Sequence, residues 1–100
     1  MVERADLERL SELFQALSDP TRLRILELLK NGKHPFCVNA IAHHVGISQS
    51  AASQHLKILR QNGLVNVKKE GYFKHYSLNL DNLAKIRSMR KAVLGEDFAL

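Results

Sequence analysis

The sequence predicts a mainly helical domain with one small β-hairpin, in the order helix, helix, helix, helix, strand, strand, helix. Apolar residues recur every three or four positions before residue 62 and after residue 79, which is typical of amphipathic helices. Between residues 64 and 78 they alternate with polar residues, which is typical of strands. The chain has 100 residues, of which 45% are hydrophobic, so we expect residues 1–100 to form a single domain around one core.

Two amphipathic helices are expected at the start of the chain. In residues 3–17, leucines and a phenylalanine lie three and four positions apart and form one apolar stripe. Asp19 and Pro20 are typical of the start of a second helix, because a carboxylate can cap free N–H groups and proline fits the first turn. The apolar stripe continues until Asn31-Gly32, which is expected to end this helix in the usual C-terminal manner. Residues 33–36 are predicted to be a short loop.

The next two helices are short and meet at a sharp turn. The apolar spacing predicts one helix over Cys37–Val45 and another over Gln49–Gln61. Between them, Gly46 permits the turn, Ile47 fills the corner and Ser48 caps the second helix. Two helices joined in this way form a helix-turn-helix, whose second helix can enter the DNA major groove, which is about 12 Å wide.

The outward face of this second helix is polar in its first two turns and basic further along. The stretch from Gly46 to Lys69 contains no acidic residue, whereas an ordinary solvent-exposed helix face often carries glutamate. Glutamine amides and serine hydroxyls can bond to base edges, and lysine and arginine suit phosphates. We therefore expect base contacts from Ser48, Gln49, Ser50, Ser53 and Gln54, and phosphate contacts from Lys57 and Arg60.

A hairpin is predicted directly after this helix. The expected strands, Leu64–Lys69 and Phe73–Leu78, flank a tight turn at Glu70-Gly71. Such a hairpin can lie along the DNA backbone as a wing, and we expect phosphate contacts from its lysines. The alternative is an exposed hairpin whose lysines only protect its edges from aggregation. The three lysines concerned are Lys68, Lys69 and Lys74.

The charge distribution favours a polyanionic partner for these elements. The formal net charge is +5. Residues 1–20 contain two basic and five acidic side chains, a net charge of −3, whereas residues 43–78 contain five basic and one acidic side chain, a net charge of +4. The positive charge is therefore concentrated in the helix-turn-helix and the hairpin, although a solvated basic surface would show the same pattern.

Three stretches resemble motifs of the ArsR/SmtB, or arsenic-repressor, family of winged helix-turn-helix transcriptional regulators. Residues 16–29 resemble its opening signature, residues 47–65 its recognition helix and residues 69–78 its wing. The resemblance covers residues 7–90 and implies a homodimer that binds a palindromic operator, in most cases as a repressor that an inducer releases. The sequence does not identify the operator or the inducer.

The first and last helices are expected to form the dimer interface. A last helix is predicted from Asn79 to about Leu94, with its own apolar stripe. Two long apolar stripes present more apolar surface than one small core needs, which supports dimerisation independently of the resemblance. Two-fold symmetry would then place the two recognition helices about 34 Å apart, one turn of DNA.

Many proteins of this family sense metal ions, but the two family sites are incomplete in this chain. One uses Cys-Val-Cys, where this chain has Cys37-Val38-Asn39, and the other uses Asp-x-His, where it has Asp81-Asn82-Leu83. Too few ligands remain for tight binding, so we expect no metal and no cofactor. Cys37 is either a redox sensor near a helix start or a small buried hydrophobe.

Other classes of function are less compatible with the sequence. We recognise no Cys–His or Ser–His–Asp set and no glycine-rich phosphate loop, so we do not expect an enzyme. A winged-helix module that binds protein or RNA is the remaining alternative to a DNA-binding regulator. The single cysteine and the lack of a signal peptide or a long apolar run lead us to expect a cytoplasmic protein without membrane contact.

Overall fold

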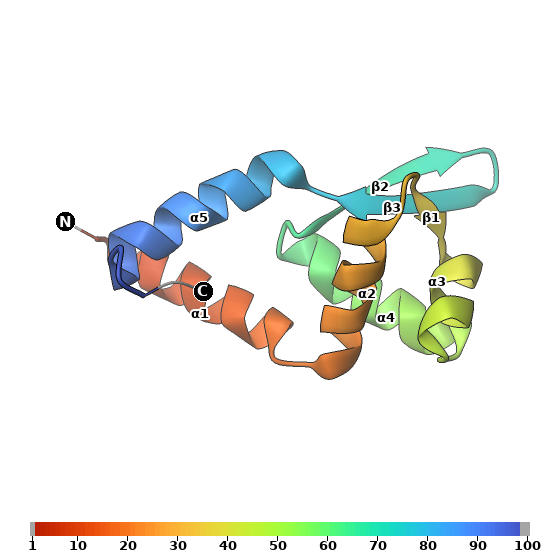
Figure 1. Cartoon of the computed structure of the whole chain (residues 1–100), viewed down its shortest axis with the longest axis horizontal. Coiled ribbons are helices and arrows are strands. Elements are labelled where there is room, and N and C mark those ends of the chain that lie inside the picture. Colours follow the sequence, from red (N-terminus) through yellow and green to blue (C-terminus); the bar gives the residue numbers. More distant parts are fainter. Residues whose placement is uncertain (1, 99–100) are drawn as a thin grey trace.

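The computed structural model describes residues 2–98 as five helices and three strands (Figure 1). Residues 1, 99 and 100 of the predicted domain lie outside the described residues. The elements are α1 (Arg4–Leu17), α2 (Pro20–Asn31), β1 (Phe36–Cys37), α3 (Val38–Val45), α4 (Gln49–Gln61), β2 (Val65–Glu70), β3 (Phe73–Leu78) and α5 (Leu80–Leu94). The predicted helices and the hairpin are confirmed, whereas β1 was not predicted.

The sheet has three antiparallel strands in the order β1-β3-β2, rather than the two strands of a hairpin. β1 consists of Phe36, which was assigned to a loop, and Cys37, which was assigned to the start of a helix. These two residues pair with Tyr76 and His75 of β3. A strand of two residues has no detectable period, and its partner lies far along the chain, so only the folded structure reveals it.

The prediction for the end of α2 was wrong in its physical reason. Gly32 caps α2 with φ −73° and ψ 146°, which is extended backbone rather than the left-handed conformation of a usual glycine cap. The constraint at this position is steric, because a Cβ atom would overlap the ring of Phe36 and that ring would have to shift. In contrast, Gly46 at the end of α3 has φ +79°, and its left-handed backbone confirms the predicted turn.

The core lies between the four N-terminal helices and one face of the sheet. Each of these helices contributes at least one side chain that is almost fully inaccessible, and Tyr76 of β3 is also buried. Burial of one large aliphatic side chain contributes about 1.5–3 kcal/mol. On α4, the buried side chains occupy one face, so the opposite face is held outward. The largest fully buried side chains are Leu13, Ile25, Ile41, Leu56 and Leu59.

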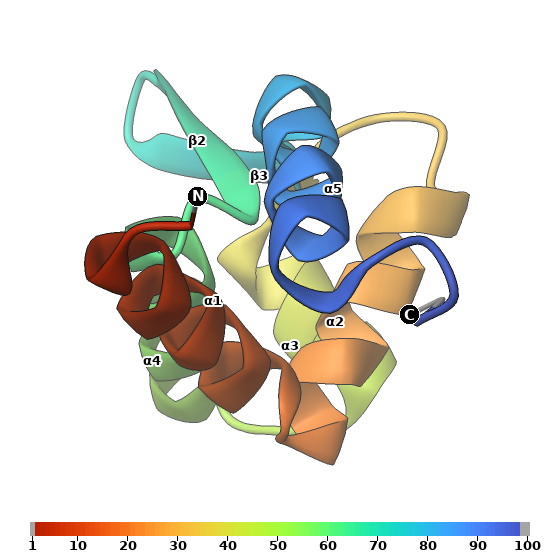
Figure 2. The same ribbon diagram turned by 90° about the vertical axis from the view of Figure 1, so that its left-hand side faces the viewer.

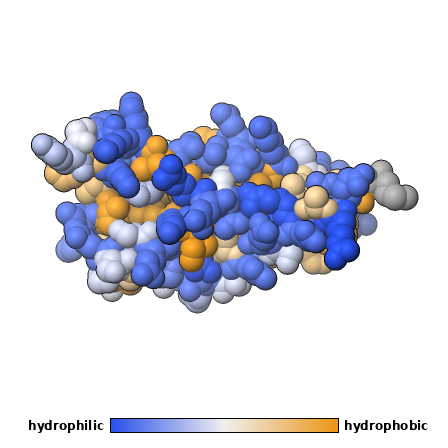
Figure 3. Space-filling view, turned by 180° about the vertical axis from the view of Figure 1, so that it is seen from behind, coloured by the Kyte–Doolittle hydropathy of each residue, from blue (hydrophilic) through white to orange (hydrophobic). Residues whose placement is uncertain are grey.

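α1 and α5 lie together at one end of an elongated molecule measuring 45 × 24 × 23 Å (Figures 1 and 2). None of the fifteen residues of α5 is buried. Leu7 and Phe14 of α1 and Leu80 of α5 are large apolar side chains that remain exposed. From behind, apolar patches interrupt a mostly hydrophilic surface (Figure 3). The exposed side chains of α1 and α5 are compatible with the dimer interface expected there, which stays a prediction.

The N-terminus of α2 is capped as predicted. Oδ1 of Asp19 accepts hydrogen bonds from the backbone amides of Thr21, at 2.8 Å, and Arg22, at 3.1 Å. The amide of Arg22 makes the largest contribution to lowering the pKa of Asp19. The amide of Thr21 and the positive charge of the Arg22 guanidinium also lower the pKa of Asp19. Partial burial of the carboxylate raises it, but the lowering contributions are larger.

This cap predicts an acid-sensitive contribution to stability. The folded-state pKa of Asp19 lies below its ordinary value of 3.8, so the stabilisation is complete above that value and is lost as the pH falls through the lowered folded pKa. We expect Asp19→Asn, which keeps an acceptor oxygen but not the charge, to reduce the loss of stability between about pH 7 and pH 2. Thermal unfolding across this range measures the effect. Asp97→Asn, at an exposed position near the C-terminus, is the control, and equal acid dependence in both variants would contradict the prediction.

Candidate nucleic-acid interface

α3, the turn and α4 form the predicted helix-turn-helix. The backbone amide of Ile47 donates to the carbonyl oxygen of Ala42 at 3.0 Å, which closes the turn after Gly46. The Ser48 hydroxyl accepts a hydrogen bond from the amide of Ala51 at 3.0 Å, which confirms the predicted cap of α4. The start of α4 is therefore rigidly attached to α3, as the insertion of a recognition helix into a groove requires.

All ten residues that were predicted to contact DNA are exposed. The opposite face of α4 is anchored by Ala52, Leu56 and Leu59, each with an exposed fraction of 0%. The polar face is therefore accessible to a partner, although contact with DNA itself stays a prediction. The exposed residues are Ser48, Gln49, Ser50, Ser53, Gln54, Lys57, Arg60, Lys68, Lys69 and Lys74.

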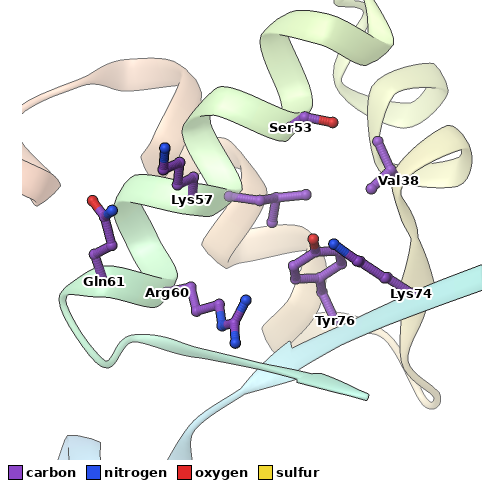
Figure 4. A pocket seen from close by; sticks show the side chains of 8 residues that line it. Val38, Ser53, Lys57, Arg60, Gln61, Lys74 and Tyr76 are labelled. Carbon is purple, nitrogen blue, oxygen red and sulfur yellow. The ribbon is translucent and has the colours of Figure 1, made fainter. Parts of the chain in front are cut away.

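A cleft separates α4 from β3, and we call it the α4–wing cleft (Figure 4). It has a volume of about 470 Å³, and three cationic side chains from two distant parts of the sequence line it. Within the described part of the chain, its lining contains no acidic side chain. Such a cleft suits an anion. Its lining residues are Val38, Ser53, Leu56, Lys57, Arg60, Gln61, Lys74 and Tyr76.

The cleft continues toward the tip of the wing. A second hollow shares Val38, Ser53 and Lys74 with it and extends to Gln49 and Tyr72. Tyr72 is fully exposed at the wing turn, at 101%. The end of α4 that is predicted to read bases and the cationic cleft therefore border one continuous groove, the arrangement needed if base contacts and backbone contacts are made together.

The three lysines of the wing, all expected to contact phosphates, do not lie on the same face of the hairpin. Lys69 and Lys74 are directly opposite in the β2–β3 ladder, so their side chains share one face. Lys68 is opposite His75 and therefore points to the other face, where its Nζ lies 3.8 Å from a carboxylate oxygen of Glu70. Two like charges directly opposite each other are unfavourable in the free protein. An anion between Lys69 and Lys74 would relieve this repulsion.

Two further residues of the cleft were not identified from the sequence. Gln61 is the last residue of α4, and its side chain lines the cleft. Tyr76 of β3 is buried, with an exposed fraction of 8%. It also lines the cleft beside Lys74 (Figure 4). No sequence pattern indicates this role, because it depends on how β3 and α4 are placed relative to each other in the folded protein.

The remaining candidate ligands are dispersed. Cys37 is half-buried at the end of β1 and borders the second hollow. Its redox role stays a prediction. Among residues 2–98, no group of three or more His, Cys, Asp or Glu side chains is placed to hold a metal ion. The rings of His34 and His44 instead contact Phe36, with centroid separations of 5.0 and 5.9 Å. Across the same residues, no helix is both long and apolar enough to cross a membrane.

Comparison with known proteins finds sequence similarity to a family of regulators. The family model of bacterial regulatory proteins of the arsR family matches residues 19–67. Nodulation protein NolR of Rhizobium meliloti is 38% identical over 92 residues, 92% of this chain and 74% of that protein. Transcriptional repressor SdpR of Bacillus subtilis is 43% identical over 70 residues, 70% of this chain and 76% of that protein.

The fold is shared as well. The solution structure of a homodimeric winged helix-turn-helix DNA-binding domain from Mycobacterium bovis matches with a TM-score of 0.74 and 30% identity. The match covers 99% of this chain and 92% of that one. The predicted winged helix-turn-helix is thereby confirmed, with α4 as recognition helix and β2–β3 as wing. The chain belongs to the ArsR family and is a DNA-binding transcriptional regulator rather than an enzyme.

Proposed function

We propose that this protein represses transcription as a homodimer that binds a palindromic operator, with α4 in the major groove and the wing along the backbone. The observation that carries the proposal is the exposed, acid-free face of α4, which borders a cleft lined by three cations. The Bacillus subtilis relative is named a repressor, and the Mycobacterium bovis domain is a homodimer, which supports the same activity and assembly here. Such a protein would work in the cytoplasm, where the DNA is.

Within this proposal, base reading and backbone binding are separate tasks. Residues on the first two turns of α4 have neutral hydrogen-bonding groups and read base edges. Cationic residues of the cleft and wing neutralise phosphates and set the register on the duplex. The proposed readers are Ser48, Gln49, Ser50, Ser53 and Gln54, and the proposed phosphate contacts are Lys57, Arg60, Lys69 and Lys74, with Lys68 on the far face of the wing as a weaker candidate.

The dimer interface is proposed to consist of α1 and α5. An apolar groove between these helices is lined by Leu10, Leu13, Phe14, Leu83 and Ile86, among others. A second copy could cover this groove and the exposed leucines beside it, which would remove apolar surface from water. The two-fold axis would then present two recognition helices to successive major grooves, about 34 Å apart.

We expect two single substitutions to separate the readers from the phosphate contacts. Gln54→Ala should reduce the difference in affinity between the selected operator and unrelated duplexes by about 5- to 100-fold for each half-site, because one base-edge contact is lost in each. Lys69→Ala should weaken all duplexes alike and lower the slope of log K against log salt by about 1 for each protomer, or about 2 for the dimer. Fluorescence anisotropy titrations at several salt concentrations, with DNA selected by the wild-type protein, measure both quantities.

The same titrations test the proposed function itself. Binding of wild-type protein to duplex DNA should weaken steeply with salt and should saturate at two chains per operator. Affinity that does not change with salt, or that is higher for single-stranded RNA than for any duplex, would contradict DNA regulation and favour another winged-helix role. If Gln54→Ala and Lys69→Ala both weakened every duplex equally, the division between readers and phosphate contacts would be wrong.

A further inference from the structure

The C-terminal end of the recognition helix is held by an arginine from α1. One guanidinium nitrogen of Arg9 donates to the side-chain oxygen of Asn62 at 3.1 Å, and the other donates to its backbone carbonyl at 2.6 Å. Asn62 is the C-cap of α4, and its side-chain amide donates to the carbonyl oxygen of Ile58 at 2.9 Å. Glu12, one turn along α1, lies 3.7 Å from the same guanidinium.

The residue after this cap is held from the other side by α5. The side-chain amide of Asn82 donates to the carbonyl oxygen of Gly63 at 2.8 Å. The first turn of α5 is itself ordered by Asn79, whose side chain accepts a hydrogen bond from the amide of Asn82 at 3.1 Å. The backbone amide of Asn79 donates to the carbonyl oxygen of Leu64. α5 is therefore attached by hydrogen bonds to the two residues that follow Asn62.

These contacts meet at one point, which we call the α4 clamp and define as Arg9, Asn62, Gly63 and Asn82. A Cβ atom on Gly63 would overlap the side-chain amide of Asn82 and lie 3.6 Å from Arg9. The clamp is partly buried, and its bonds from Arg9 are charge-assisted, so they are stronger than ordinary surface hydrogen bonds. A guanidinium beside a helix C-terminus is also favoured by the helix dipole.

We infer that Arg9 and Asn82 are positioning residues that set the orientation of α4 relative to the dimer axis. Both side chains come from the helices proposed to form the dimer interface, and both hold the end of the helix proposed to read DNA. Because a dimer reads two half-sites at once, a change in this orientation alters the half-site spacing that fits both helices. The inference rests on the proposed function. It adds two residues, Arg9 and Asn82, that determine the preferred half-site spacing although neither lies on the face of α4 proposed to enter the DNA major groove.

The test is a series of palindromes that carry one half-site sequence with its spacing changed one base pair at a time. Wild-type protein should prefer one spacing sharply. In Arg9→Lys, which keeps the charge but loses the two-nitrogen contact, and in Asn82→Ala, the preference for the best spacing over its neighbours should fall by about fivefold or more. Affinity for a single half-site should change little, because the reading face of α4 is intact.

Arg4→Lys is the matched control, because Arg4 lies on the same helix, its side chain is exposed, and among residues 2–98 it pairs only with Glu8, at 3.2 Å. It should keep the wild-type spacing profile. Thermal unfolding and sedimentation identify any variant whose fold or dimer is lost. Arg9→Lys and Asn82→Ala test the inference independently, because they alter contacts from different helices. An unchanged spacing profile in a folded, dimeric variant of either residue would overturn the inference. Failure of wild-type protein to bind any duplex would instead overturn the proposed function.

Discussion

Neutralising the three cations of the α4–wing cleft is expected to weaken binding to every duplex by about 100- to 1000-fold for each protomer near 0.1 M salt. The variant replaces Lys57, Arg60 and Lys74 with glutamine, which keeps a polar side chain of similar length. Each phosphate contact releases about 0.9 counterions, so the loss of three contacts in each protomer should lower the slope of log K against log salt by about 3 per protomer, or about 5 for the dimer. The discrimination between operator and unrelated DNA should persist, because the base-reading residues are unchanged.

A matched control is available on another element. Arg24, Lys30 and Lys33 comprise one arginine and two lysines, they are exposed on α2 and the loop after it, and none of them lines the cleft. Replacing them with glutamine lowers the net charge by the same amount. If both triple variants lost affinity and salt dependence equally, the effect would come from overall charge, and the α4–wing cleft would not be a phosphate site.

Replacing Gly63 with alanine is expected to destabilise the fold by about 2–3 kcal/mol, because two costs add. Gly63 has φ +70°, and alanine in this left-handed region costs about 1–2 kcal/mol. The new methyl group would also overlap the Asn82 amide and displace its hydrogen bond to the Gly63 carbonyl, a further loss of about 1 kcal/mol. For a domain of this size, the thermal midpoint should fall by about 10–20 °C.

Gly71→Ala distinguishes the two costs. Gly71, in the wing turn, has φ +62°, but a Cβ atom there would have no neighbour within 4 Å. Its alanine variant should therefore show only the backbone cost and a smaller fall in the thermal midpoint, about half that of Gly63→Ala. Equal midpoints for the two variants would mean that the contact between Gly63 and Asn82 contributes nothing to stability.

The local elements of this protein were predictable from its sequence, because they depend on neighbouring residues. The apolar spacing of α4, the cap at Ser48 and the turn at Gly46 are all determined within a few positions of one another. The same holds for Asp19 and the start of α2. The polar face of α4 could also be predicted as exposed, because a helix that buries Ala52, Leu56 and Leu59 must turn its other face outward.

Contacts between distant segments could not be predicted, because no local periodicity in the sequence indicates them. β1 exists only through pairing with β3, and the space at Gly32 is limited by the ring of Phe36, which packs against it. The separation of Lys68 from Lys69 and Lys74 depends on the strand register.

Local sequence by itself thus determined that this chain has a recognition helix with a polar outward face, followed by a basic wing. Only the tertiary structure decided which cations share a cleft with that helix, and which side chains of α1 and α5 hold its end. The physical reason is the separation along the sequence over which each kind of interaction acts. Helix caps and apolar stripes act over a few residues, whereas Arg9 and Asn62 are 53 positions apart and meet only after the helices have packed.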